Sequence, residues 1–241
     1  MTAVDILKSS REGAVLVLTL QRPEARNALN LDLTRALRAA FSAFDADEAL
    51  RCLVLTGADP AFCAGLDLKE FRVPGSPRGE VGAMIRAFPE RRKPAIGAIN
   101  GVTMTGGLEL ALGCDFLIAS ERAGFGDTHI KVGTLSGGGM TSRLPHQVGV
   151  RWAKQMSLTC QPIDAATALR IGLVNEVVAH DSLLPRALEL AQLIASYDPG
   201  LVADTRRVLE QGSEVTLKGN MALETEALDA MRARGPNAWK L

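Results

Sequence analysis

Hydrophobic residues in the first three quarters of the chain fall into short runs separated by polar loops and amphipathic segments. The run "AVLVLTL" is typical: it is aliphatic and β-branched, and Arg22 and Pro23 end it soon afterwards. Continuous apolar runs of this length indicate strands that are buried on both faces. Four such runs predict strands, at residues 14–20, 51–57, 95–100 and 115–120.

Helical spacing appears between these runs. Asn30 is a suitable N-cap for a helix, and the apolar residues after it recur every three to four positions. These apolar residues are Leu33, Leu37, Ala40 and Phe44. Further helical patterns cover residues 78–91, 106–113, 140–149 and 151–158. Strands that alternate with helices predict the α/β class.

The last part of the chain reads differently, because the strand signal nearly vanishes from about residue 164. Apolar residues from Leu184 to Ile194 mark one face of a helix, and residues 199–212 and 217–233 have similar patterns. The sequence therefore predicts a core over residues 1–180 and a helical region over residues 181–241. We expect this region to serve packing or oligomerisation.

Composition narrows the possible functions. Lys and Arg together number 27, as do Asp and Glu, so no net charge draws the chain to nucleic acid or to a membrane surface. The four cysteines form no CxxC pair, which argues against a zinc or redox motif. The first residues lack a leader pattern, and no apolar run approaches 18 residues. We expect a cytoplasmic protein with no membrane, metal or nucleic-acid partner.

Two glycine-containing loops are candidates for ligand binding. They are "PAFCAGLDL" (60–68) and "NGVTMTGGLELAL" (100–112), and each leads from a strand into a helix. The first N–H groups of a helix have no internal partner and can bind a ligand, although these glycines could also simply form tight turns. No GxxxxGK[ST] pattern is present, and no GxGxxG opens a long helix, so nucleotide hydrolysis is not expected.

Glu109 is the strongest catalytic candidate from chemistry alone. It follows Gly106 by three residues and interrupts the apolar helix "LELALG". A carboxylate in a first helical turn is favoured by the helix dipole, which is the alternative explanation. A carboxylate in a segment expected to be buried nevertheless needs a reason, and this favours a functional role.

Taken together, these segments resemble the crotonase family, the enoyl-CoA hydratase/isomerase superfamily, over about residues 10–180. The matching stretches are "LQRPEARNAL" (20–29), "LVLTGADPAFCAGLDLKEF" (53–71), "KPAIGAINGVTMTGGLELALGCDFLIAS" (93–120), "FGDTHIKVGTLSGGGMTSRLPHQVG" (125–149) and "LTCQPIDAATALRIGLVNEVV" (158–178).

The resemblance implies a crotonase-like spiral of β-β-α units with a helical C-terminal trimerisation region, assembled as a homotrimer or a dimer of trimers. It implies an acyl thioester of coenzyme A as substrate and no other cofactor. The thioester oxygen would accept hydrogen bonds from the backbone N–H groups of Leu66 and Gly106. Two fixed donors of this kind form an oxyanion hole, which stabilises the charge that develops on the oxygen.

The resemblance also assigns the coenzyme A channel. The backbone around Ala25, Arg26, Ala64 and Leu68 would line it, and Arg26 is the candidate for a phosphate contact. Asp67 lies among these residues, although we expect it chiefly to cap the short helix that carries Leu66.

The position of His129 is the main departure from the family. Its hydratases use two glutamates to hold one water: Glu109 matches the first, and "FGDTH" places His129 where the second is usual. Imidazole can act as an acid or a base near neutral pH, and Asp127 could orient it. The alternative is a neutral histidine that only shapes the pocket. His146 and His180 are interpreted as surface or loop residues without a role, and Ser136 replaces a proline common in the "PGxGG" turn.

The leading hypothesis is hydration of a 2-enoyl-CoA double bond, with Glu109 as base and His129 assisting. One alternative is another acyl-CoA reaction on the same scaffold: isomerisation, hydrolysis or decarboxylation. Isomerases of the family usually keep the glutamate that is absent here, which weakens that alternative. A third hypothesis is a non-catalytic acyl-CoA-binding or RNA-binding relative. Zero net charge and the retained Glu109 argue against RNA.

Overall fold

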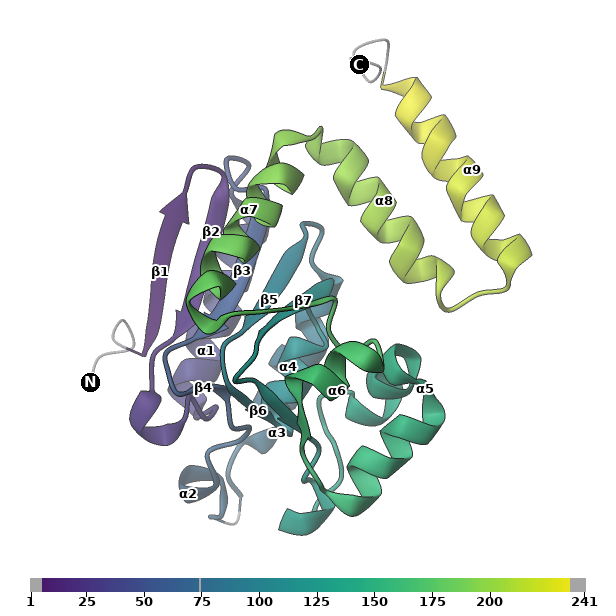
Figure 1. Cartoon of the computed structure of the whole chain (residues 1–241). Helices are drawn as coiled ribbons and strands as arrows, with labels where there is room; N and C mark the ends of the chain where they lie inside the picture. Colours follow the sequence, from purple (N-terminus) through teal and green to yellow (C-terminus); the bar gives the residue numbers. More distant parts are fainter. Residues whose placement is uncertain (1–5, 74, 235–241) are drawn as a thin grey trace.

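A six-stranded sheet forms the larger part of the computed structural model, which describes residues 6–73 and 75–234 (Figure 1). β1 pairs antiparallel with β2, and the remaining neighbours in the sheet are parallel. The order across the sheet is β1 (Leu7–Glu12), β2 (Val15–Leu20), β3 (Cys52–Gly57), β5 (Ala95–Ile99), β7 (Phe116–Ser120) and β10 (Glu176–Val178).

A second sheet consists of short strands that alternate along the chain with strands of the first. Its order is β4 (Ala61–Cys63), β6 (Val102–Met104), β8 (Gly124–Gly126) and β9 (Ile163–Asp164), with β9 antiparallel to β8. Three times, a long strand of the first sheet leads directly into a short strand of the second: β3 into β4, β5 into β6 and β7 into β8. Helices follow these pairs, so the chain repeats a β-β-α unit, as the family resemblance implies.

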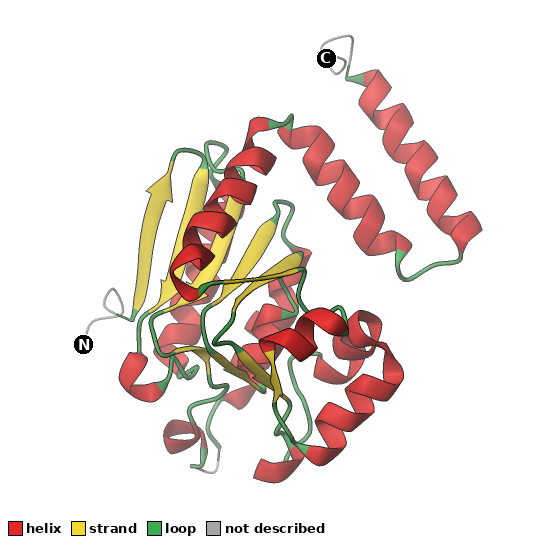
Figure 2. Cartoon of the chain, viewed as in Figure 1, coloured by secondary structure: helices red, strands yellow, loops and turns green. Residues whose placement is uncertain are grey.

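Most of the helices lie around the two sheets, and the last two extend away from them (Figure 2). The α-helices are α1 (Leu31–Ala46), α2 (Leu68–Phe71), α3 (Arg78–Ala87), α4 (Gly106–Ala111), α5 (Met140–Thr159), α6 (Ala165–Arg170), α7 (Leu183–Ser196), α8 (Pro199–Gly212) and α9 (Leu217–Ala233). Short 3-10 turns are η1 (Pro23–Ala25), η2 (Phe88–Glu90), η3 (Ile130–Val132) and η4 (His180–Ser182). None of the helices within the described ranges is both long and apolar enough to cross a membrane.

The six-stranded sheet is buried on both faces, as its apolar runs predict. Along β2, Val15 and Val17 pack with α7, whereas Leu16 and Leu18 face the main core on the other side. This alternation follows from the two-residue period of a strand. α7 lies across the sheet, and its apolar face fills the second core.

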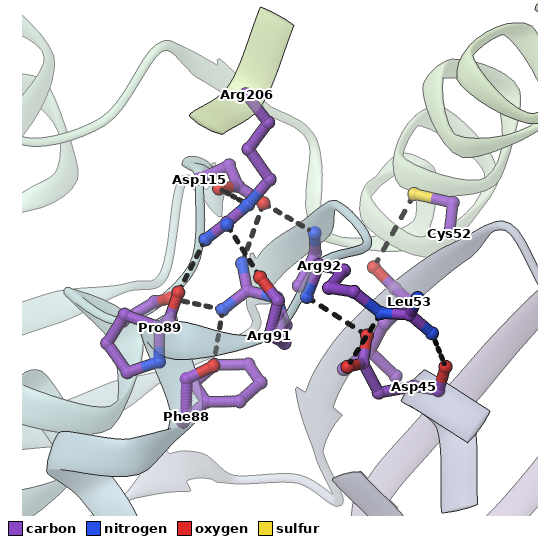
Figure 3. Close-up of polar contacts among 11 residues, drawn as sticks. Asp45, Cys52, Leu53, Phe88, Pro89, Arg91, Arg92, Asp115 and Arg206 are labelled. Carbon is purple, nitrogen blue, oxygen red and sulfur yellow. Dashed lines mark hydrogen bonds and ion pairs between the residues drawn. The ribbon is translucent and has the colours of Figure 1, made fainter. Parts of the chain in front are cut away.

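The last two helices form a hairpin that extends from the rest of the chain (Figure 1). Arg206 attaches α8 to the core: its Nε lies 2.7 Å from Asp115 Oδ1, and its guanidinium donates hydrogen bonds to the carbonyl oxygens of Arg91 and Pro89, each at 2.7 Å (Figure 3). The Arg91 guanidinium donates to the other oxygen of Asp115 at 2.6 Å. One carboxylate therefore joins two arginines from distant parts of the chain.

Several predicted elements are confirmed. All four long strands are present, and the Asn30 side chain accepts a hydrogen bond from the Leu33 N–H at 2.9 Å, which caps α1. The two helices predicted at 140–149 and 151–158 are α5, which a non-helical Gly149 divides. The C-terminal helices match their predicted ranges closely, and residues 235–241 of that region lie outside the described residues.

Other expectations were wrong in detail. Strand β10 lies at 176–178, beyond the point where the strand signal fades, because three residues paired with β7 leave no clear pattern in the sequence. The helix predicted at 78–91 ends as α-helix at Ala87 and continues as the turn η2, which contains Pro89. Proline removes a backbone donor and so disrupts a regular helix.

Candidate active site

The two glycine loops predicted from the sequence are in direct contact. Gly65 has a φ of 97°, a left-handed conformation that favours glycine. A Cβ atom on Gly65 would lie 1.9 Å from Thr105 Oγ1 and 3.3 Å from the Gly106 nitrogen. A Cβ atom on Gly107 would lie 2.1 Å from the Cys63 carbonyl oxygen. These glycines therefore do more than form turns, since they let the loop after β4 touch the first turn of α4.

Each loop carries a backbone N–H group that has no acceptor among the described residues. Leu29 accepts from the Asp67 N–H at 3.0 Å and donates to the Gly65 carbonyl at 2.7 Å, so the intervening Leu66 N–H faces away from Leu29. Gly106 is the first residue of α4, where an N–H has no partner inside the helix. Neither the Leu66 nor the Gly106 N–H donates a hydrogen bond among the residues described.

Thr105 sets the direction in which α4 begins. Its φ of 45° and ψ of −115° are unusual for a residue with a side chain. Its own N–H donates to the Gly126 carbonyl at 2.9 Å, which fixes it against the short strand β8. Backbone strain of this kind persists only where the surrounding structure enforces it, and it often marks functional sites.

Glu109 is buried at the N-terminal end of α4, with 2% of its surface exposed. Its Oε1 accepts three hydrogen bonds: from the Ser136 hydroxyl at 2.5 Å, the Gly138 N–H at 2.8 Å and the Met140 N–H at 3.2 Å. Ser136 and Gly138 belong to the loop that leads into α5, and Met140 is the first residue of that helix. They satisfy the requirement that a buried carboxylate be hydrogen-bonded.

His129 lies opposite Glu109, directly before η3, and is 7% exposed. Its Nε2 lies 3.8 Å from Glu109 Oε2. On the other side of the ring, Nδ1 lies 2.6 Å from Asp127 Oδ1, and the same carboxylate oxygen accepts the backbone N–H of His129 at 3.2 Å. The structure thus brings together the three titratable side chains that the sequence singled out.

Electrostatics favour a protonated His129 and an ionised Asp127. Burial acts to lower the pKa of His129, but the hydrogen bond with Asp127 and the charges of Glu109 and Asp127 outweigh it, and the pKa rises above its ordinary value. Burial acts to raise the pKa of Asp127, but the His129 hydrogen bonds dominate and lower it. We therefore assign the Nδ1 proton of His129 to the contact with Asp127.

The residues predicted to line a coenzyme A channel lie next to these loops. The Ala64 N–H donates to the Arg26 carbonyl at 3.0 Å, so Arg26 and Ala64 are held side by side. The Arg26 side chain is exposed and forms no ion pair within residues 6–73 and 75–234. Ala25 precedes it as the last residue of η1, and Leu68 is 40% exposed at the start of α2.

Asp67 has a structural role in the chain. Its side chain accepts a hydrogen bond from the Lys69 N–H at 3.1 Å and so caps α2, and it forms an ion pair with Arg22 at 2.8 Å. The sequence predicts that the capped helix carries Leu66, but α2 begins at Leu68. Leu66 precedes the cap and pairs with Leu29 instead.

The sequence favours a surface or loop position for His180, but both nitrogens of its ring have polar partners. Its Nδ1 lies 3.0 Å from the buried Ser120 hydroxyl, and its Nε2 lies 3.0 Å from Asp59 Oδ2. This cluster joins the ends of β7 and β3 to η4, apart from the Glu109 and His129 pair. His146 is exposed on α5, as expected.

A cavity of about 1180 Å³ lies elsewhere, between α8 and the core, and its lining includes Asp115, Arg143 and Arg206. None of Leu66, Gly106, Glu109 and His129 lines it.

In the part of the chain that the structure describes, no group of three His, Cys, Asp or Glu side chains could hold a metal ion. The candidate site offers two N–H groups, the carboxylates of Glu109 and Asp127, and the imidazole of His129.

The spiral of β-β-α units and the two adjoining glycine loops define the crotonase fold. The chain belongs to the enoyl-CoA hydratase/isomerase family, whose model matches residues 10–235. It is 40% identical over 225 residues to a probable enoyl-CoA hydratase of Rhizobium meliloti, covering 92% of this chain and 88% of that protein. The family prediction is confirmed.

Other relatives agree with this assignment. The short-chain-enoyl-CoA hydratase of Clostridium acetobutylicum is 37% identical over 90% of this chain and 85% of its own. Among solved structures, the enoyl-CoA hydratase of Mycobacterium tuberculosis H37Rv is 45% identical with a TM-score of 0.80, covering 93% of this chain and 98% of that one. The enoyl-CoA hydratase of Bacillus anthracis has a TM-score of 0.90 at 32% identity, covering 93% and 90%.

Proposed function

We propose that this chain adds water to the double bond of a 2-enoyl-CoA thioester. The observation that carries the proposal is the buried pair of Glu109 and His129, with Glu109 Oε2 and His129 Nε2 3.8 Å apart. The names of several relatives, among them a crotonyl-CoA hydratase of Syntrophomonas wolfei at 36% identity, support the same reaction.

The separation of the two side chains suits one water molecule. A water about 2.8 Å from each atom can bridge Glu109 Oε2 and His129 Nε2. It donates a hydrogen bond to the carboxylate and accepts one from the imidazolium. The carboxylate is then placed to take a proton from this water as the water oxygen bonds to the β-carbon.

The proton balance closes within the pair. Glu109 takes one proton from water, and His129 gives its Nε2 proton to the α-carbon, so the product is the 3-hydroxyacyl thioester. Both side chains are then neutral. Transfer of the proton from Glu109 back to His129 restores the starting state, and the 3.8 Å separation makes this transfer short.

The Leu66 and Gly106 N–H groups are the proposed oxyanion hole. Addition at the β-carbon moves negative charge onto the thioester oxygen, and two donors that are already oriented stabilise it without reorganisation. The contact between the two loops and the absence of a protein acceptor for either N–H among the residues described support this role.

The remaining parts of the proposal concern binding and assembly. We propose that Ala25, Arg26, Ala64 and Leu68 contact coenzyme A, with the exposed Arg26 guanidinium near a phosphate. Asp67 supports this edge through its cap on α2. Location in the cytoplasm and assembly as a homotrimer or a dimer of trimers stay predictions.

A panel of 2-enoyl-CoA thioesters of increasing chain length tests the reaction. We expect loss of the conjugated double bond and formation of 3-hydroxyacyl-CoA, identified by mass spectrometry, for at least one member. The same panel should contain a 3-enoyl-CoA and a saturated acyl-CoA. Turnover of only the 3-enoyl or the saturated thioester would instead identify an isomerase or a hydrolase.

A further inference from the structure

We propose that Ser136 is a positioning residue that dedicates one oxygen of Glu109 to anchoring and leaves the other for proton transfer. The inference rests on the proposed function of Glu109 as the base. It concerns a side chain outside the two loops that would form the oxyanion hole, in the loop between η3 and α5.

The Ser136 hydroxyl is the donor in its hydrogen bond with Glu109. The Ser136 oxygen accepts the Met140 N–H at 3.0 Å, and it lies 2.5 Å from Glu109 Oε1. An ionised carboxylate has no hydrogen to give, so the hydroxyl donates. A short hydrogen bond to a charged acceptor is among the stronger kinds in proteins.

The two oxygens of Glu109 are consequently unequal. Oε1 accepts from Ser136 and Gly138, which use its two lone pairs, and it shares the Met140 N–H with the Ser136 oxygen. Oε2 accepts no hydrogen bond from the residues described and faces His129 Nε2. Oε2 is thus the oxygen free to take a proton, and the anchor on Oε1 fixes where it points.

The anchoring loop is itself held in place. The Arg86 guanidinium, on α3, donates to the Gly137 carbonyl. A Cβ atom on Gly82, also on α3, would lie 2.8 Å from the same carbonyl oxygen. Close packing of α3 against this loop fixes the position of Ser136, and Ser136 in turn positions Glu109.

A proline at position 136 could not form this hydrogen bond, since proline has neither a hydroxyl nor an N–H donor. Ser136 and His129 contact different oxygens of the Glu109 carboxylate. The serine hydroxyl therefore supplies an additional anchor for the carboxylate that faces the imidazole.

Ser136→Ala, Ser136→Thr and the control Thr134→Ala test the role of the hydroxyl. Thr134 lies in the same loop and is exposed, and its side-chain hydroxyl donates to the adjacent Leu135 carbonyl. For Ser136→Ala we expect kcat to fall by ~10-fold with KM changed by less than ~2-fold, since the base is misplaced while binding persists. Ser136→Thr should restore most of kcat, and Thr134→Ala should match the unmodified protein.

Crystal structures of the unmodified protein and of Ser136→Ala provide a readout that does not depend on turnover. We expect the Glu109 carboxylate to rotate or to occupy two positions in Ser136→Ala. An unchanged carboxylate together with unchanged kcat would overturn the inference. If no enoyl-CoA is hydrated by the unmodified protein, the proposed function fails, and the crystallographic comparison alone decides whether Ser136 positions Glu109.

Discussion

The residue at position 129 determines how a proton reaches the substrate in the proposed mechanism. A glutamate there would have to be protonated to act as an acid, whereas an imidazolium carries a proton to donate at moderately acidic and neutral pH. Asp127 and Glu109 both favour this charged form, because they raise the pKa of His129 against the effect of burial. The substitution therefore preserves a proton donor but changes its pH range.

A pH profile tests this role. Because the pKa of His129 is raised, the imidazolium is fully present below the ordinary value of about 6.5 and is lost as the pH rises through the higher value of the folded protein. We expect kcat/KM for an enoyl-CoA to decline along this basic limb. His129→Ala should remove the limb and lower turnover, and Asp127→Asn should shift the limb to lower pH.

Full hydratase activity of His129→Ala with an unaltered pH profile would refute the proton-donor role. His129 would then only fill the pocket. His146→Ala is the matched control, since His146 is exposed on α5 and should leave the profile unchanged.

At the level of elements, the sequence predicted the strands and helices that are long enough to show a hydrophobic pattern. The buried strands and the amphipathic C-terminal helices have clear patterns, so β3 and α8 match closely. The short strands β4, β6 and β8 have three residues each, and their pairing depends on segments far apart in sequence. No local pattern could indicate them.

Some features of the candidate site could likewise be predicted from the sequence, and others could not. Glu109 and His129 could be named as candidates because each lies in a motif of the family resemblance, and these motifs follow one another along the chain in the family's order. The anchoring of Glu109 by Ser136 and Gly138 arises from packing between α4 and a loop nearly 30 residues later, where the sequence has no periodicity. The one available signal was that Ser136 stands in place of a proline.

Arg206 offers a prediction about how α8 is attached. Its side chain is 12% exposed and makes an ion pair with Asp115 and two bonds to carbonyl oxygens (Figure 3). We expect Arg206→Ala to lower the free energy of unfolding by ~1–3 kcal/mol, because it removes three hydrogen bonds to partly buried acceptors. Urea denaturation measures this change.

Arg207→Ala is the control, since the Arg207 guanidinium lies 3.9 Å from Asp204 near the surface. It should change stability by less than about 1 kcal/mol. Equal losses for the two variants would show that Arg206 is not the attachment point of α8.

At the scale of the whole molecule, the α8–α9 hairpin exposes several large apolar side chains to solvent. Leu209, Leu217 and Met221 are 68%, 79% and 60% exposed. Apolar surface gathered on an extended element is typical of a protein interface. This agrees with the predicted homotrimer or dimer of trimers.

Light scattering coupled to size-exclusion chromatography tests the assembly. We expect the unmodified protein to be a trimer or hexamer, and the double variant Leu217→Glu and Met221→Glu to shift toward monomer, because charge replaces apolar contact area. Lys218→Glu changes charge on the same turn without removing apolar surface and should stay assembled. A monomeric unmodified protein would contradict the prediction.

Turnover by Glu109→Gln on the best enoyl-CoA substrate tests most directly whether Glu109 is the base. Glutamine keeps the shape of the side chain and can still accept from Ser136 and Gly138, but it cannot take the proton from water. We expect kcat to fall at least ~100-fold while acyl-CoA binding, measured by calorimetry, stays nearly intact. Unchanged turnover would contradict the mechanism and assign Glu109 a purely structural role.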